Sequence, residues 1–320
     1  MCVADPRHLW TVVLAGGEGT RLRRLTRALH GEDRPKQFAF IHGGQSLLQT
    51  TLARAQRWTA PERSVVVVAR EREALARTQI GPDSPIDVVA QPHNRGTGPG
   101  LLLPLSRILA RDPDALVVIL PSDHYVRDEA PFERSILSAI DTARAEDAVV
   151  LVGAVPESPE TQYGWIMGSA GAQQKHRVIQ QFWEKPALDC ARRLFSSGAL
   201  WNTFVMVGTA RRFWQLACAH LPAQALCFEA YRRAVDTPDE RRVLDEIYAT
   251  LPSADFSADV LQRARDLRMV PLEACGWSDW GTPERVLESL RRDFRSLTRQ
   301  LELAEKVTAF ERLQAAALSC

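Results

Sequence analysis

The sequence lacks several features that would assign it to a special class of protein. Its 320 residues carry 40 Lys and Arg against 39 Asp and Glu, a formal net charge of +1, so no overall field attracts a nucleic-acid backbone or an acidic membrane. No uninterrupted apolar run approaches the length needed to cross a bilayer, and the start of the chain lacks the basic and apolar regions of a signal peptide. We therefore expect a cytoplasmic protein without nucleic-acid or membrane partners.

Cysteine pairs and repeats are also lacking. The 6 cysteines show no CxxC pair and no zinc-finger spacing, which favours reduced thiols over disulfide bridges or zinc. There is no internal repeat, low-complexity tract or long linker. With 45% hydrophobic and 25% charged residues, a chain of this length can bury a large core. We expect one catalytic domain over residues 1–285 and a helical extension over residues 286–320.

Short β-rich runs alternate with helical patterns along the first half of the chain. This alternation predicts an α/β fold with parallel βαβ units, in which ligands bind at the carboxyl ends of the strands. The expected strands are Thr11–Leu14, Ser64–Ala69, Asp87–Ala90, Ala115–Leu120 and Ala148–Val152. The expected helices, with apolar residues at three- and four-residue steps, are Leu47–Ala55, Glu71–Thr78, Gly100–Ala110 and Pro131–Arg144.

A glycine-rich turn follows the first expected strand. Gly16, Gly17 and Gly19 allow the backbone to approach an anion closely, and two cations, Arg21 and Lys36, follow them. Such a turn can hold a triphosphate, but three glycines alone are equally consistent with a tight connection in an α/β protein. The lysine lies far downstream of the glycines and is not followed by Ser or Thr, which separates the pattern from a Walker loop.

Two aspartates are candidates for a metal site. Asp123 lies two residues after Pro121, which ends a strongly apolar run and should end strand pairing there. A magnesium ion that bridges nucleotide phosphates needs only one or two carboxylates, since it keeps several waters. Asp123 is equally suited to cap the following helix. Asp279 lies in a Ser-Asp-Trp-Gly string that by itself signals a turn.

Together these strings resemble the signature of the sugar-1-phosphate nucleotidylyltransferases. The run Gly16–Arg21 with Pro35-Lys36-Gln37-Phe38 is similar to the family's phosphate-binding loop, and its Gln-Phe ending looks like the mannose-1-phosphate guanylyltransferase branch. Pro121–His124 resembles the family's metal motif, and Asp279–Gly281 resembles a segment whose aspartate completes that site. The resemblance implies a Mg²⁺ ion held by Asp123 and Asp279.

Further strings resemble the sugar-phosphate half of the family's site. They are Tyr163-Gly164-Trp165, Phe182–Pro186 and Gly198–Asn202. The resemblance implies that Glu184 and Asn202 hydrogen-bond sugar hydroxyls and that Lys185 faces the 1-phosphate. Without the resemblance, the adjacent Glu184 and Lys185 would be interpreted as an ordinary exposed ion pair, because neighbouring Glu and Lys are common on protein surfaces.

The stretch Gln91–Pro99 resembles, more loosely, the family segment beside the base and ribose. The resemblance assigns to the nucleotide Leu14, Ala15, Gly16, Gly17, Gly19, Thr20, Arg21, Lys36, Pro92, Asn94, Arg95, Thr97 and Ser122. It assigns to the sugar Tyr163, Gly164, Glu184, Lys185 and Asn202, and to catalysis Arg21, Lys36 and Lys185.

The chain departs from the family pattern at several positions. Gln91 and Gly98 replace an acid and an alanine, so contacts near the purine are expected to differ. Arg23 and Arg24 replace Trp-Pro, where they would either strengthen triphosphate binding or form a solvated loop. Phe204 replaces a glycine, and its bulk would narrow or move the sugar pocket.

The resemblance implies a Rossmann-like fold of the nucleotide-diphospho-sugar transferase type, with a mixed, mainly parallel sheet flanked by helices. It also implies a Mg²⁺-dependent attack of a sugar 1-phosphate on GTP, giving GDP-mannose as the expected product. Two alternatives stay open. One is the same reaction with another nucleotide or hexose 1-phosphate, and the other is a non-catalytic regulator that binds a nucleotide sugar.

The end of the sequence is expected to form a helix. Thr282 is a suitable N-cap, Pro283 suits the first turn, and no glycine or proline follows. A stripe of apolar residues should lie on one face of this helix, either against the chain's own domain or in a homodimer seam. The stripe consists of Leu287, Leu290, Phe294, Leu297, Leu301 and Ala304, followed after a phase shift by Val307 and Phe310.

Overall fold

The computed structural model describes residues 8–169 and 176–295. In these ranges one mixed sheet of nine strands runs through the molecule in the order β3-β2-β1-β4-β8-β5-β9-β7-β6, with a further pairing of β8 with β6. The strands are β1 (Leu9–Ala15), β2 (Ser64–Ala69), β3 (Asp87–Gln91), β4 (Leu116–Pro121), β5 (Val150–Ala154), β6 (Gly164–Gly168), β7 (Arg177–Trp183), β8 (Leu200–Thr209) and β9 (Arg268–Pro271).

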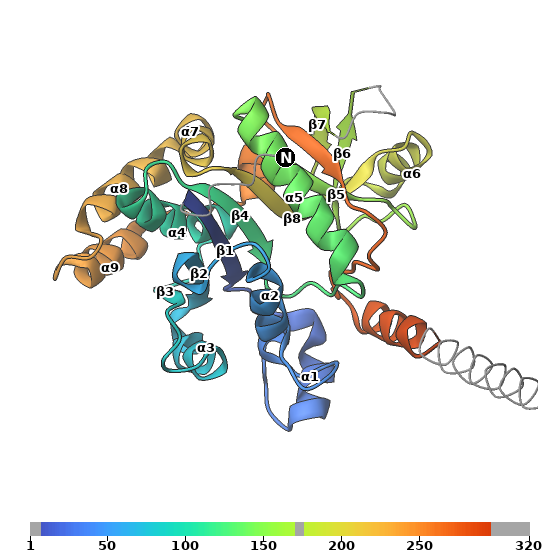
Figure 1. Cartoon of the computed structure of the whole chain (residues 1–320), viewed down its shortest axis with the longest axis horizontal. Helices are drawn as coiled ribbons and strands as arrows, with labels where there is room; N and C mark the ends of the chain where they lie inside the picture. Colours follow the sequence, from blue (N-terminus) through green and yellow to red (C-terminus); the bar gives the residue numbers. More distant parts are fainter. Residues whose placement is uncertain (1–7, 170–175, 296–320) are drawn as a thin grey trace, which may run out of the picture.

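Helices flank the sheet (Figure 1). They are α1 (Arg23–His30), α2 (Leu47–Ala55), α3 (Glu73–Ile80), α4 (Thr97–Arg111), α5 (Glu129–Glu146), α6 (Leu188–Ser196), α7 (Ala210–His220), α8 (Pro222–Ala234) and α9 (Glu240–Thr250). Every strand and helix predicted for the first half of the chain is present, and its ends lie within three residues of the prediction. The prediction for β2 and α2 matches at both ends.

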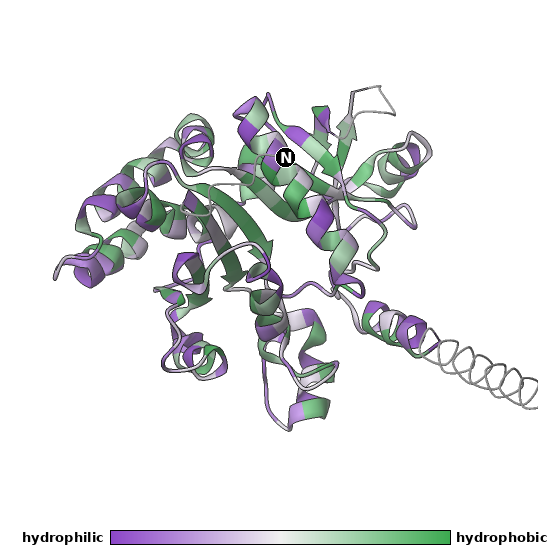
Figure 2. Ribbon diagram, in the orientation of Figure 1, coloured by the Kyte–Doolittle hydropathy of each residue, from purple (hydrophilic) through white to green (hydrophobic). Residues whose placement is uncertain are grey.

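Both faces of the central strands are covered, which explains why these strands are apolar at successive positions. On one face, Val12 of β1 and Val117 of β4 pack with residues of α4, α7, α8 and α9. On the other face, Val13 packs with α2 and α3, and Val118 packs with α5. Figure 2 shows the central strands as the most continuously hydrophobic part of the ribbon.

The sheet is mixed, as predicted, and the predicted fold class is confirmed. Pairing is parallel between β1 and β2, β1 and β4, β2 and β3, and β5 and β9. The other five pairings among the described strands are antiparallel. The parallel pairs from β3 to β4 form the N-terminal half of the sheet, and β6, β7 and β8 add antiparallel pairs that the sequence pattern did not reveal.

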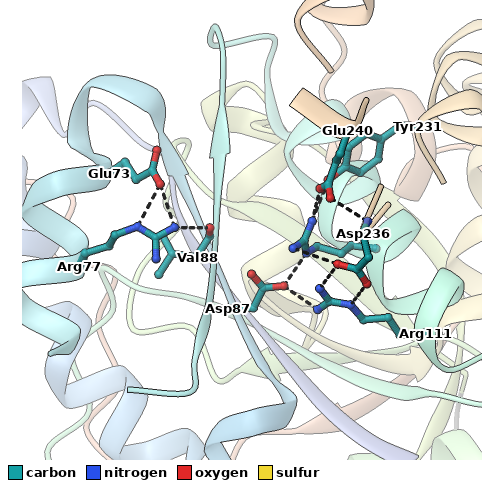
Figure 3. Close-up of polar contacts among 9 residues, drawn as sticks. Glu73, Arg77, Asp87, Val88, Arg111, Tyr231, Asp236 and Glu240 are labelled. Carbon is teal, nitrogen blue, oxygen red and sulfur yellow. Dashed lines mark hydrogen bonds and ion pairs between the residues drawn. The ribbon is translucent and has the colours of Figure 1, made fainter. Parts of the chain in front are cut away.

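An ion-pair network fastens the edge strand β3 to α4, α8 and α9 (Figure 3). Arg111 of α4 lies 2.7 Å from Asp87 of β3, and the hydroxyl of Tyr231 on α8 donates to Glu240 of α9 at 2.6 Å. Arg107 contacts both carboxylates and joins the two pairs. The network thus holds α8 and α9 against α4 and the edge of the sheet.

The predicted C-terminal helix begins at Pro283 and is helical over residues 283–295. Thr282 caps it, since its Oγ1 accepts from the backbone N–H of Arg285 at 3.4 Å. Of the predicted stripe, Leu290 is partly buried but Leu287 is 48% exposed. The fully buried residue of this turn is Val286, which the predicted stripe does not include. The predicted stripe was thus wrong in phase at its start, because the helix docks through Val286. The stripe beyond residue 295 lies outside the described residues.

Across the described ranges, no helix is both long and apolar enough to span a bilayer. Four cysteines in these ranges, Cys190, Cys218, Cys227 and Cys275, are free thiols. Cys2 and Cys320 lie outside the described residues.

Candidate active site

The candidate site forms where β1 and β4 end next to each other at the carboxyl edge of the sheet. These strands pair in parallel, so the loops that follow Ala15 and Pro121 begin side by side. Ser122 joins them, because its backbone N–H and its hydroxyl donate to the carbonyl of Leu14 at 3.0 and 2.7 Å. The Ser122 side chain is therefore engaged with the backbone at this junction.

Gln37 holds the glycine-rich turn in place. Its Nε2 donates to the carbonyls of Ala15 at 2.8 Å and Gly17 at 2.7 Å. Gly19 has a φ of 61°, and a Cβ at this position would lie 3.0 Å from the backbone nitrogen of Lys36. Glycine is needed here both for the left-handed backbone and for the close approach.

The turn borders a cavity of about 390 Å³. Arg21 is exposed, and its guanidinium forms no ion pair with any residue that the structure describes, so its charge is available to a ligand. Six predicted site residues line the cavity together with Glu18, Leu22 and Gly281; they are Gly19, Thr20, Arg21, Lys36, Asn94 and Asp123.

Lys36 lies between the two predicted metal-binding segments. Its Nζ is 3.0 Å from Oδ2 of Asp123, and it donates to the carbonyl oxygens of Asp279 at 2.5 Å and Trp280 at 3.3 Å. Lys36 and Asp279 are 243 positions apart in the sequence. The fold thus brings the glycine-rich turn, the β4 loop and the Asp279 loop together at one ammonium group.

One oxygen of the Asp279 carboxylate is held by three donors. Oδ1 accepts from the Tyr163 hydroxyl at 2.7 Å, the Gly281 N–H at 2.8 Å and the Arg285 guanidinium at 2.9 Å. Arg285 also pairs with Glu160 and lies over the Tyr163 ring, 4.6 Å from its centroid. No donor among the described residues is hydrogen-bonded to Oδ2, so this oxygen is left for another partner.

Local charges keep both aspartates ionised. Burial alone would raise the pKa of Asp123, but the Lys36 ammonium beside it holds that pKa below its usual range. For Asp279, the effect of burial is outweighed by the hydrogen bond from Tyr163 and the charges of Arg285 and Lys36, so its pKa is also lowered. Two ionised carboxylates, of which Asp123 lines the cavity and Asp279 belongs to the loop beside Lys36, suit a hard divalent cation.

The neighbouring His124 stays neutral at neutral pH. Burial lowers its pKa to about 4, although the nearby Asp123 acts in the opposite direction. Its Nδ1 accepts from the indole N–H of Trp277 at 3.2 Å, which fixes the ring. His124 therefore adds no positive charge beside the carboxylate.

The donor set fits a magnesium ion bound together with a nucleotide. The described residues contain no cluster of three or more His, Cys, Asp or Glu side chains that could hold a metal alone, so phosphate and water oxygens would complete the coordination. The alternative role of Asp123 as a helix cap is wrong. The N-cap of α5 is Asp128, whose side chain accepts from the backbone N–H of Ala130.

Four predicted sugar-binding residues lie together beyond this cavity. Gly164 pairs with Asn202 across β6 and β8, and a Cβ on Gly164 would lie 3.0 Å from Oε2 of Glu184. Lys185 lies 2.8 Å from Glu184, with 55% of its side chain exposed. Tyr163 links this group to the predicted metal ligand Asp279, because its hydroxyl donates to that carboxylate.

Phe204 adopts a left-handed backbone conformation, with a φ of 59°. Glycine takes this conformation without steric cost, which explains physically why the resembling family has glycine here. The N–H of Phe204 donates to Oδ1 of Asn202 at 3.3 Å, and its ring packs partly buried against the core. The Asn202 amide nitrogen is thereby oriented by its own strand.

The stretch predicted to lie beside the base is divided by the fold. Asn94 lines the cavity. In contrast, the Arg95 guanidinium donates to the carbonyl of Tyr248 at 3.1 Å, and Thr97 Oγ1 accepts from the N–H of Phe256 at 2.7 Å. Arg95 and Thr97 thus anchor the stretch to α9 and to the short π-helix η6 (Phe256–Leu261), while Pro92 is buried.

A model of the nucleotidyl transferase family matches residues 10–295. This range contains the glycine-rich turn, both aspartates and the strands of the sugar side. The chain belongs to the nucleotidyl transferase family. The resemblance found in the sequence is thereby confirmed.

Relatives support the same placement within the nucleotidyl transferase family. The xanthan biosynthesis protein XanB of Xanthomonas campestris pv. campestris (strain B100) is 32% identical over 286 residues, which cover 88% of this chain and 59% of XanB. The mannose-1-phosphate guanylyltransferase of Escherichia coli K12 is 32% identical over 285 residues, covering 86% and 58%. The chain therefore spans about three fifths of the length of these relatives.

Solved structures confirm the fold of this nucleotidyl transferase. A Thermus thermophilus protein described as a mannose-1-phosphate geranyltransferase superposes with a TM-score of 0.76 and 30% identity, covering 86% of this chain and 76% of that one. A Helicobacter pylori protein described as a mannose-6-phosphate isomerase superposes with a TM-score of 0.67 and 21% identity, covering 84% and 99%.

Several residues at the family site were missed by the sequence analysis. Gln37 was quoted within a motif but given no role, although it braces the turn. Arg285 and Glu160 belong to no motif, and nothing in the sequence distinguishes Arg285 from the other arginines of the predicted tail. Its contact with Asp279 depends on how the C-terminal helix docks, which only the fold decides.

Proposed function

We propose that this nucleotidyl transferase transfers the guanylyl group of GTP to mannose 1-phosphate, giving GDP-mannose and pyrophosphate. The observation that carries the proposal is the convergence of Arg21, Lys36 and Asp123 on one cavity with the Asp279 loop beside it. Relatives of the matching range named mannose-1-phosphate guanylyltransferase supply the substrates. The proposed division of the chain stays at residues 1–285 for catalysis and 286–320 for the helical extension.

In the proposed reaction, a phosphate oxygen of the sugar 1-phosphate bonds to the α-phosphorus of GTP, and the bond from that phosphorus to the bridging oxygen breaks. Pyrophosphate leaves with that oxygen. No protein nucleophile is needed. Because two anions must meet in line, catalysis comes from positioning and charge neutralisation.

Each cluster of the site has a part in this reaction. Arg21 and Lys36 would neutralise the triphosphate in the cavity. Asp123 and Asp279 would hold Mg²⁺, which supplies positive charge at the α-phosphate when bound. On the sugar side, Lys185 would face the 1-phosphate, while Tyr163, Gly164, Glu184 and Asn202 would orient the hexose.

Pyrophosphate release over a grid of nucleoside triphosphates and sugar 1-phosphates tests the proposal. We expect the highest rate with GTP and mannose 1-phosphate. A preference for UTP or dTTP would overturn the nucleotide half, and a preference for glucose 1-phosphate with GTP would overturn the sugar half. A chain that binds a nucleotide sugar but releases no pyrophosphate with any pair would be a regulator.

We also propose that the C-terminal helix contributes to a homodimer. Val286 and Leu290 pack within the chain, beside Leu22 and Trp280, which covers one face of the helix. Leu287 on the same helix is 48% exposed. The proposal is that the rest of the predicted stripe, which lies outside the described residues, forms the seam with a second copy.

A further inference from the structure

We propose that the Lys36 ammonium and the divalent cation compete for the Asp123 carboxylate, so that the triphosphate opens the metal site by drawing Lys36 onto its phosphates. The inference rests on the proposed function, because it concerns the metal expected there. It assigns Lys36 a second role, which is to exclude a bare cation until the nucleotide arrives.

The contacts of Lys36 are those of a cation held by oxygen atoms from both predicted metal-binding segments. Its Nζ lies 3.0 Å from the Asp123 carboxylate, and it donates to the carbonyls of Asp279 and Trp280. The Lys36 side chain is 8% exposed, whereas that of Asp123 is 34% exposed. Solvent and ligands thus reach the Asp123 carboxylate more readily than they reach the Lys36 ammonium.

Charge is the reason that the two cations exclude each other. Asp123 and Asp279 are close enough to repel, and Lys36 is the cation that stabilises both of them. A divalent ion that binds Asp123 must approach the Lys36 ammonium, and both cations would be only partly hydrated there. Like charges repel strongly in such a setting, so metal binding requires the ammonium to move away.

Lys36 has a place to move to without a change in the backbone. Its backbone is fixed in the short helix η3 (Lys36–Phe38), where the N–H of Ala39 donates to the Lys36 carbonyl at 3.0 Å. Its side chain lines the same cavity as Gly19, Thr20 and Arg21. A lysine side chain is flexible and carries a point charge, so it can turn from the carboxylate to a phosphate in that cavity.

The competition makes metal and nucleotide bind cooperatively. A triphosphate that attracts Lys36 releases Asp123 for the metal, and a metal on Asp123 releases Lys36 for the triphosphate. The coupling is reciprocal, because each ligand removes the same obstacle for the other.

Titration of the nucleotide-free chain with Mn²⁺ alone, followed by the electron paramagnetic resonance signal of free Mn²⁺, tests this inference. We expect Lys36→Gln and Lys36→Met to bind Mn²⁺ about tenfold to a hundredfold more tightly than the wild type, the range that one charge-assisted hydrogen bond represents. Lys36→Gln keeps N–H donors for the two backbone carbonyls, so it carries the test on its own should Lys36→Met fail to fold. Circular dichroism and thermal unfolding check this.

Arg21→Met is the matched control. Arg21 lines the same cavity and carries the same charge, but it contacts neither aspartate. Its loss should change Mn²⁺ affinity by less than about twofold, because an exposed charge is screened by solvent. Lys36→Gln should give no gain in an Asp123→Asn background, because the shared carboxylate is absent.

Two results would overturn the inference. One is Mn²⁺ affinity in both Lys36 variants that is equal to or weaker than that of the wild type. The other is an equal gain in Arg21→Met, which would mean that overall charge and not occupancy of Asp123 sets the affinity. The proposed function is tested separately by pyrophosphate release from the wild type, so the two failures can be told apart.

Discussion

The two aspartates expected to share the metal are held in different ways. Asp123 is contacted by one long side chain, that of Lys36, at 3.0 Å. Asp279 is fixed through Oδ1 by Tyr163, Gly281 and Arg285. A carboxylate held by several donors presents its other oxygen in one direction, as the partners of metal ligands commonly arrange. We therefore expect Asp279 to set the geometry of the metal site and Asp123 to be the ligand whose access Lys36 controls.

Replacing either aspartate with asparagine keeps its size and removes its charge. We expect Asp123→Asn and Asp279→Asn each to slow pyrophosphate release about a hundredfold or more, the cost of losing one electrostatic stabiliser, with little change in urea unfolding. Asp128→Asn is the matched control on the same loop, because asparagine caps a helix as well as aspartate does. Near-normal turnover of Asp279→Asn would refute the shared metal.

Arg285 is expected to act as a positioning residue for Asp279. Arg285→Met should raise the Mg²⁺ concentration needed for half-maximal rate about tenfold, the usual effect of losing a partner of a metal ligand, and Arg285→Lys should restore part of it. Arg292→Met is the control on the same helix, because Arg292 pairs only with the exposed Glu157 and Glu288 among the described residues. An unchanged Mg²⁺ dependence of Arg285→Met would contradict this role.

At the scale of elements, β8 decides where the sugar side lies. It pairs antiparallel with β4, β5 and β6, and its register with β5 shifts between Leu151 and Gly153. The partners of Leu151 and Gly153 are Met206 and Asn202, so β8 uses more residues than β5 across the shift. The extra residues form a bulge around Phe204, which has a positive φ. Such bulges redirect side chains next to active sites, and here the bulge lies directly after Asn202.

The network around Arg107 gives a stability prediction at this scale. The Arg107 side chain is 15% exposed and contacts Asp87 and Glu240, so Arg107→Met leaves two half-buried carboxylates without it and should cost about 3 kcal/mol in urea unfolding. Arg77→Met should cost less than about 0.5 kcal/mol, since Arg77 and Glu73 form an exposed pair on one helix (Figure 3). Equal losses in the two variants would contradict the structural role of the network.

At the scale of the whole molecule, the C-terminal helix packs against two loops of the site from outside the sheet. Val286 packs beside Leu22, which follows the glycine-rich turn, and beside Trp280, while Arg285 reaches Asp279. The turn after β1 and the Asp279 loop are thus joined through one helix. Removing the whole helix would remove the contact of Arg285 with Asp279, so a test of assembly has to keep residues 283–295.

Truncation after Arg295 separates assembly from catalysis. We expect the shortened chain to lose assembled mass in light scattering at micromolar concentration, because the proposed seam is removed, and to keep its rate of pyrophosphate release. The competing interpretation is that the rest of the predicted stripe packs within the chain, as Val286 and Leu290 do. A full-length chain that is already monomeric at this concentration would rule out the dimer.

The sequence by itself determined the parts of the protein that depend on local pattern. Continuous apolar runs and helical periodicity specified the strands and helices of the first half, since both faces of those strands are buried. The residue types in the turn at Gly16–Arg21, at Lys36 and at Asp123 and Asp279 indicated the proposed chemistry, because phosphate and magnesium accept few kinds of partner.

Only the tertiary structure decided the features that depend on distant contacts. Nothing local marks Arg285 as the partner of Asp279 or Lys36 as the partner of Asp123, because these contacts arise from helix docking and strand pairing across the whole chain. The antiparallel β6–β8 region escaped prediction for the same reason, as its strands are specified by their neighbours in the sheet more than by their own pattern. Local motifs therefore indicate the residue types of the site, whereas the contacts between those residues depend on the fold of the whole chain.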